Sequence, residues 1–222
     1  MYPGIVALVP LSGRCIECDQ RRVARELTQS RPFMILIGTG PREATARTED
    51  RVSIENPQRL TAREDVERLA VERVHEDRDH CGVDSAGEVA VAVTNDDGEY
   101  LLLMHDEMGI AILPHGDVDA GDDWAATARE ATEALTGVSI AIDDVAAVRT
   151  ETHVVEGESE PHATTRSILF RASPTGGDIQ ACKRDAESGS DGWRAGWVAD
   201  LPDGIEPAPE GTPREDLRWF LG

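Results

Sequence analysis

The chain has 222 residues, of which 43 are acidic and 22 basic, and its formal net charge is −21 at pH 7. This length accommodates one domain of about 130 to 170 residues with extensions and leaves little room for two. The acidity argues against a protein that binds nucleic acid through its phosphates, because such binding needs clustered Lys and Arg, and no basic patch is visible.

The charge is unevenly distributed along the chain. Lys183 is the only lysine, and the carboxylate excess is typical of a protein adapted to high internal salt, as in halophilic archaea. Residues 1–50 contain seven Arg and six acidic residues, whereas residues 51–222 contain 15 basic and 37 acidic residues. Two interpretations of residues 1–54 stay open. They are either an extension absent from the native protein, which would start near Glu55, or a genuine but poorly ordered extension.

No apolar run approaches the roughly 18 residues needed to span a bilayer. The short apolar run Ile5–Pro10 lacks the preceding positive charge and the cleavage site of a secretion signal. We therefore predict a cytoplasmic protein with no membrane partner.

Four cysteines raise the question of a metal or redox site. Cys15 and Cys18 form a CxxC pair, which can supply half of a zinc site, but no second CxxC follows. The spacing of His75, His80 and Cys81 matches no familiar ligand pattern. We therefore expect unligated thiols. The remaining histidines offer no arrangement around a nucleophile, and His105, His153 and His162 are predicted to be polar surface residues.

Predicted elements begin after the extension with a lead-in segment, residues 55–86. Within it, residues 65–76 fit either a short helix or a strand with a leading helix. The main domain is predicted for residues 87–222. It opens with two apolar runs on either side of Asn95–Gly98, a pattern typical of a β-hairpin with a glycine-containing turn.

A third short strand is predicted at Met108–Leu113, ended by Pro114 and a loop. Asp122 or Asp123 then offers an N-cap to a helix that runs to Thr136, and Gly137 ends it. The later elements are further strands, a polar surface loop and a terminal helix, at Ser139–Ile142, Val145–His153, Arg166–Ala172, residues 173–192, Trp193–Val198 and Pro213–Leu221. Mixed strands around one or two helices predict an α/β fold, an α/β/α sandwich with a mixed β-sheet.

The segment Leu113–Val138 resembles the Nudix box, G-x5-E-x7-R-E-U-x-E-E-x-G-U, where U is aliphatic. Gly116 and Gly137 occupy the two glycine positions, Asp122 the first acidic position and Val138 the last. The likeness covers about residues 87–222. It implies a Nudix-like fold and hydrolysis of nucleoside-diphosphate-linked compounds with Mg²⁺ or Mn²⁺ held by glutamates on the motif helix.

The ligand positions of the motif depart from the family. Three glutamates at i, i+3 and i+4 share one helix face and can converge on divalent cations. Here those positions hold Ala131, Ala134 and Leu135, and the arginine position holds Glu130. The box is degenerate in this frame, because its helix lacks the carboxylates that the family mechanism uses.

A frame slipped by one residue stays open as an alternative. Arg129–Glu133 then spells R-E-U-x-E, and the slip recovers two carboxylates at the cost of a rotation of about 100°. In that frame Glu130 and Glu133 are the candidate catalytic and metal-binding residues, with Asp122 as a further metal ligand. His115 and Gly116, in the preceding loop, are the candidate substrate-binding residues.

Two functions follow from the resemblance. One is a hydrolase with a reduced metal site, and the other is a catalytically inactive Nudix-like module that binds a ligand or a protein. The expected partner is a small nucleotide-like molecule, and a homodimer is an open alternative. Mg²⁺ or Mn²⁺ is expected only for the hydrolase.

Overall fold

The computed structural model describes residues 52–80, 85–179, 192–209 and 211–221. The helical segments in these ranges are η1 (Pro57–Ala62), α2 (Trp124–Thr136) and α3 (Thr212–Leu221). The strands are β1 (Glu67–His75), β2 (Gly87–Val93), β3 (Tyr100–His105), β4 (Ile110–Ile112), β5 (His115–Val118), β6 (Ser139–Val155), β7 (Ala163–Gly176), β8 (Trp193–Val198) and β9 (Glu206–Pro207).

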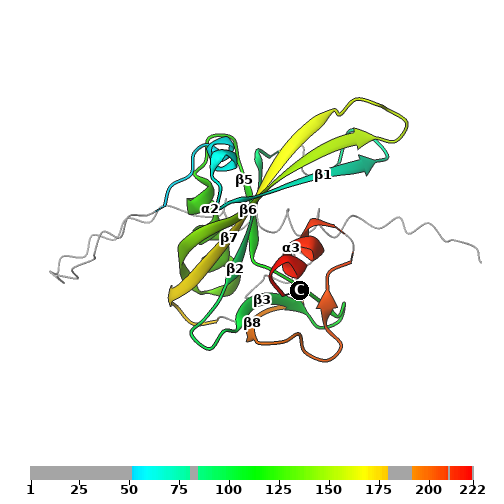
Figure 1. The fold of residues 1–222 in the computed structure, drawn as a ribbon. Coiled ribbons are helices and arrows are strands. Elements are labelled where there is room, and N and C mark those ends of the chain that lie inside the picture. Colours follow the sequence, from blue (N-terminus) through cyan, green and yellow to red (C-terminus); the bar gives the residue numbers. More distant parts are fainter. Residues whose placement is uncertain (1–51, 81–84, 180–191, 210, 222) are drawn as a thin grey trace, which may run out of the picture.

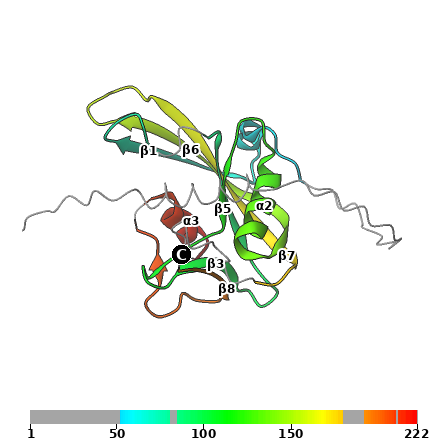
Figure 2. The same ribbon diagram turned by 180° about the vertical axis from the view of Figure 1, so that it is seen from behind.

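The strands form two sheets. A five-stranded sheet has the order β1-β6-β7-β2-β5, and a four-stranded sheet has the order β8-β3-β4-β9. The larger sheet is mixed, because β1 runs parallel to β6 and β2 parallel to β7, while β6–β7 and β2–β5 are antiparallel. Figures 1 and 2 show α2 and α3 on opposite sides of the strands. The predicted α/β sandwich with a mixed sheet is confirmed, with the second sheet as an addition.

Strand β2 lies between both helices and is buried along its whole length. Its valines, such as Val91, join the core that contains Trp124 and Ala128 of α2. Ala90 and Ala92 point to the opposite face and pack with Leu217 of α3. A nearly continuous apolar run is typical of a strand covered on both faces, and this position explains the sequence of β2.

The turn of the predicted hairpin is confirmed, but the pairing of its two strands is not. The turn exists, since Asn95 and Glu99 are joined by a backbone hydrogen bond and Thr94 bridges to Tyr100. Beyond that bridge β2 and β3 diverge, and β3 pairs with β4 and β8 in the smaller sheet. Both strands are apolar on two faces, so they are central strands of different sheets and do not form one two-stranded ribbon.

Two other predictions are decided by strand pairing. In the lead-in segment the strand alternative is right, because β1 pairs with β6 over nine residues. The loop predicted after Pro114 contains β5, whose residues His115–Val118 pair with β2. The predicted surface loop at 173–192 begins later than expected, because β7 continues to Gly176. Residues 180–191 of that loop lie outside the described ranges, as do residues 1–51 and the four cysteines.

The motif helix begins and ends where the sequence predicts. The side chain of Asp123 accepts hydrogen bonds from the backbone N–H groups of Ala125 and Ala126. Gly137 ends the helix with φ of 79°, a left-handed conformation that favours glycine. The same Asp123 carboxylate accepts from the N–H of Ile54, so the chain before η1 is fastened to the start of α2.

Helix α3 docks on the larger sheet through buried charges. Nη2 of Arg149, on β6, lies 2.5 Å from Oδ1 of Asp216, and both residues are only 2% exposed. Burial raises the pKa of Asp216 to about 7, against the opposing effect of Arg149. Beside this pair, Thr212 donates to Glu151 and Arg73 binds Glu215. In the described ranges no helix combines the length and hydropathy required to cross a membrane.

Candidate functional site

The motif helix presents an apolar face to β5. A Cβ atom added to Gly116 would lie 2.7 Å from Cβ of Ala131, so the strand and the helix touch at this point. Leu135 is 6% exposed and belongs to the main core. Two of the three positions that hold glutamates in the Nudix box are therefore packed in apolar surroundings, and only Ala134 is exposed.

The close approach of Gly116 to Ala131 predicts that a larger residue at position 116 destabilises the protein. Gly116→Ala forces Cβ against Ala131 and should destabilise the protein by about 1–3 kcal/mol, because the backbone of β5 or of α2 has to shift. Urea unfolding measures the loss. Gly176→Ala is the matched control, since an added Cβ there meets no atom within 4 Å. Equal stabilities for the two variants would contradict a packing role for Gly116.

The carboxylates recovered by the slipped frame lie on the outer surface of α2. Glu130 and Glu133 are both exposed, on the side of the helix away from the core. Asp122 is also exposed, just before the N-cap. Asp122, Glu130 and Glu133 do not form a group of ligand atoms within 4.8 Å of one another in the described part of the chain. The structure therefore does not bring Asp122 to the two glutamates, and their predicted metal and catalytic roles stay predictions.

The two predicted substrate-binding residues lie on opposite faces of the sheet. Successive residues of a strand point to opposite sides, and Gly116 faces α2. His115 therefore points to the other side, where it pairs in register with Ala90 and is 9% exposed. Its Nδ1 lies 3.2 Å from the carbonyl oxygen of Leu113. His115 and the exposed glutamates of α2 are thus separated by the sheet.

One of the acidic residues at the start of α2, Asp123, has a structural role as the N-cap of the helix. Burial opposes ionisation of Asp123, but hydrogen bonds led by that from Ile54 N–H lower the pKa of its carboxyl. Asp123 is therefore an ionised structural cap. Asp119 and Asp122 remain exposed in the turn before it.

A different group of side chains is assembled at the far end of the larger sheet. His75 ends β1, His153 lies on β6, and His80 and His162 flank them in the adjoining segments. His153 is 4% exposed, and His105 is 7% exposed beside Trp193. The prediction that these two are surface residues is wrong, because each side chain packs against other rings: His153 against His75 and His80, and His105 against Trp193.

The four imidazoles contact one another closely. Nε2 of His75 lies 2.9 Å from Nδ1 of His153, and Nε2 of His80 lies 2.8 Å from Nε2 of His162. The rings of His75 and His80 are stacked, with centroids 3.4 Å apart. Nε2 of His153 also lies 2.7 Å from Oγ1 of Thr165. Burial and then the neighbouring imidazoles lower the pKa of His75, and they lower that of His153 to about 4.

Sequence reasoning missed this cluster because its members are distant along the chain. His75 and His153 are 78 residues apart, and His80 and His162 are 82 apart. Of these two separations, that of His75 and His153 reflects the parallel pairing of β1 with β6, which keeps a constant offset along both strands. Cys81, which the sequence placed with His75 and His80, lies outside the described part of the chain.

Comparison with known proteins finds no matching family model and no matching curated protein. Similar solved structures include a NUDIX hydrolase from Nitrosomonas europaea, 21% identical, with 50% of this chain and 69% of that chain covered and a TM-score of 0.36. An ADP-ribose pyrophosphatase from Streptococcus suis is 14% identical, with 52% and 75% covered and a TM-score of 0.35. A MutT protein from Methanosarcina mazei is 16% identical, with 60% and 78% covered and a TM-score of 0.33. The likeness concerns the fold and assigns no activity.

Proposed function

We propose that this chain is a Nudix-type module that binds a nucleotide-like small molecule without hydrolysing it through the motif helix. The observation that carries the proposal is the close approach of Gly116 to Ala131, which holds the first of the three glutamate positions on the motif helix. Catalysis by the family mechanism needs carboxylates that converge on a cation at this face. An apolar face in contact with β5 offers no oxygen ligand, while the motif glycines keep the scaffold.

The test combines binding with turnover. The full chain is mixed with nucleotide sugars, ADP-ribose and dinucleoside polyphosphates at high KCl, with Mg²⁺ or Mn²⁺. We expect at least one compound to raise the melting temperature, by linkage of binding to folding, and no compound to be hydrolysed. Failure of every compound to bind would contradict the module.

A second candidate function is a hydrolase with a reduced metal site. It is favoured by one observation, that Glu130 and Glu133 lie at i and i+3 and are both exposed. In this case Glu133→Gln should lower metal-dependent turnover by at least about 100-fold, as expected when a ligand of a catalytic cation is lost. Glu107→Gln is the matched control, because Glu107 is exposed in the turn between β3 and β4.

Turnover measured for the wild type and for Glu133→Gln distinguishes the binding module from the hydrolase. Turnover that Glu133→Gln abolishes and Glu107→Gln retains would replace the module with the enzyme. Turnover that neither substitution changes would place the chemistry away from the outer face of α2.

A further inference from the structure

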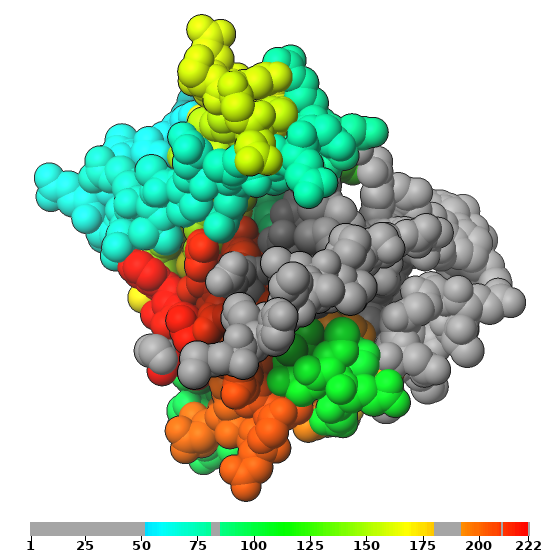
Figure 3. Space-filling model, turned by 90° about the vertical axis from the view of Figure 1, so that its right-hand side faces the viewer, coloured from blue at the N-terminus to red at the C-terminus, as the bar shows by residue number. Residues whose placement is uncertain are grey.

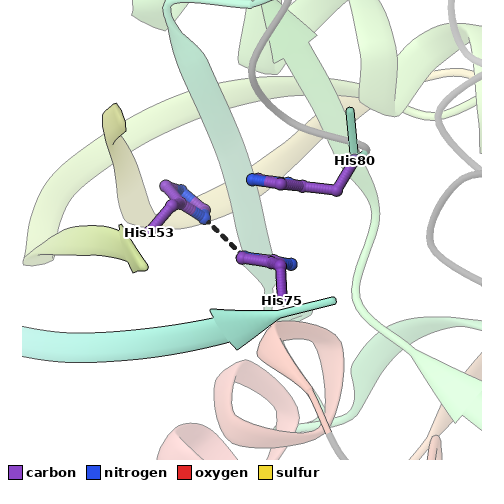
Figure 4. A group of neighbouring side chains, drawn as sticks. All are labelled: His75, His80 and His153. Carbon is purple, nitrogen blue, oxygen red and sulfur yellow. Dashed lines mark hydrogen bonds between the residues drawn. The ribbon is translucent and has the colours of Figure 1, made fainter. Parts of the chain in front are cut away.

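We propose that His75, His80 and His153 form a binding site for one divalent transition-metal ion, and that Zn²⁺ is the ion it takes. In the described part of the chain these three side chains are the group whose ligand atoms gather most clearly, all lying within 4.8 Å of one another. Figure 4 shows the three rings close together, with those of His75 and His80 one above the other and His153 hydrogen-bonded to His75. The site lies away from the motif helix, because α2 packs on β5, β2 and the part of β6 around Ile140 and Val145, whereas His153 lies near the other end of β6.

The location is set by strand register. β1 and β6 run parallel, with Arg73 opposite His153 and His75 two residues further on. The N–H of His162 donates to the carbonyl oxygen of His153 at the β6–β7 turn. In Figure 3 this turn (yellow-green) and the chain after β1 (teal) lie together at one end of the molecule. Two pairings therefore hold three of the four imidazoles at one place.

The chemistry of the donors selects the class of ion. Imidazole nitrogen suits Zn²⁺, Cu²⁺ and Ni²⁺, whereas Mg²⁺ and Ca²⁺ prefer oxygen ligands. Four of the six histidines in the chain gather here, which random placement on a surface does not explain. The net charge of −21 also favours a cation over an anion.

The distances are close to those of a zinc site. Tetrahedral Zn²⁺ with Zn–N bonds of about 2.0–2.1 Å places its ligand nitrogens roughly 3.3 Å apart. The 2.9 Å between His75 and His153 needs to widen by only about 0.4 Å to match this spacing. The stacked rings of His75 and His80 cannot both point at one ion, so one of them must turn. His80 lies outside the strands and is the ring expected to move.

The surroundings support ligation by His153. If Nε2 of His153 donates to Oγ1 of Thr165, Nδ1 carries the lone pair that faces His75. A hydrogen bond of this kind commonly orients a metal-binding histidine. Nδ1 of His162 is buried and has no hydrogen-bond partner among the described residues. Buried polar atoms are usually satisfied, so an unmatched nitrogen at this point is consistent with an absent component of the site.

Three imidazole ligands leave one tetrahedral position for water or another ligand, as in open zinc sites. Each neutral ring has one proton and one lone pair, so a change of tautomer makes a nitrogen available. His162 is not one of the three ligands. Its hydrogen bond to the ring of His80 can orient that ligand.

The test is a zinc titration of the full chain carrying Cys15→Ser and Cys18→Ser, which removes the competing thiol pair. The protein is stripped with EDTA, dialysed and titrated calorimetrically with ZnCl₂ at neutral pH. We expect one Zn²⁺ per chain and no binding of Mg²⁺. His80→Gln and His153→Gln should each weaken zinc binding at least about 10-fold, and His105→Gln should not.

Two further measurements separate the outcomes. Bound Co²⁺ should show ligand-field absorption without a thiolate charge-transfer band, and such a band would move the site to a remaining cysteine. Because His80 lies outside the strands, the His80→Gln variant should fold, and circular dichroism tests this. Absence of stoichiometric zinc, or undiminished zinc binding by His80→Gln, overturns the proposal.

Discussion

Arg149→Met is expected to destabilise the protein by about 3–5 kcal/mol. The side chain of Arg149 is 2% exposed, and its partner Asp216 is equally buried, so the substitution leaves a carboxyl group in the interior without its cation. Removing one member of a buried ion pair costs far more than the pair contributes, because the desolvation of the other member is no longer compensated. Urea unfolding measures the effect, together with proteolysis of α3, the helix that the pair holds on the sheet.

Two controls make this result specific. Arg194→Met removes a partner of Asp106 from a surface pair, with side chains 44% and 60% exposed, and should cost less than about 1 kcal/mol. The double variant Arg149→Met/Asp216→Leu should recover much of the loss, since it removes both members of the pair and leaves neither buried without its partner. A loss below about 1 kcal/mol for Arg149→Met would mean that α3 docks without this pair.

Acid should destabilise the metal-free protein through His153. The pKa of this ring is about 4 in the folded chain against 6.5 as the ordinary value, so the folded state favours the neutral form. Its contribution is fully present above pH 6.5 and is lost as the pH falls toward 4, because the unfolded chain then binds the proton more readily. The loss between pH 7 and pH 4 is about 3 kcal/mol. The lowered pKa of His75 acts in the same direction.

The measurement compares wild type with His153→Gln, both in EDTA, by urea unfolding at pH 7 and pH 4. Carboxylates and the other histidines titrate in both proteins, so the difference between their pH dependences isolates the contribution of His153. Wild type should lose about 3 kcal/mol more than the variant over this range. If the two proteins lost stability equally between pH 7 and pH 4, protonation of His153 would not be linked to unfolding.

The sequence was a good guide where the determinants are local. The motif helix was predicted within one residue at each end, because an N-cap carboxylate at Asp123 and a glycine at Gly137 act on their own backbone. The terminal helix and β8 were also predicted within one residue at each end, at Pro213–Leu221 and Trp193–Val198. The turn at Asn95–Gly98 was also right, yet its two strands join different sheets. Turn chemistry fixes a reversal of the chain but not the partners of the strands beyond it.

The candidate site depends on which side chains of α2 and β5 point toward each other, and local sequence patterns do not determine this. The spacing of the motif allowed two frames for α2. The contact of Ala131 with Gly116 belongs to the packing of that helix on β5. The alternation of β5 then separates His115 from Gly116, although they are neighbours in sequence.

The sequence placed His75 near His80, but not this pair near His153 and His162. The four histidines lie in two short segments, 75–80 and 153–162, and the parallel pairing of β1 with β6 brings these segments together. Composition, caps and hydrophobic periodicity determined the charge, the elements and the fold class, because these depend on neighbours along the chain. Tertiary structure alone decided which faces meet, since strand order depends on the burial of surfaces contributed by residues about 80 positions apart.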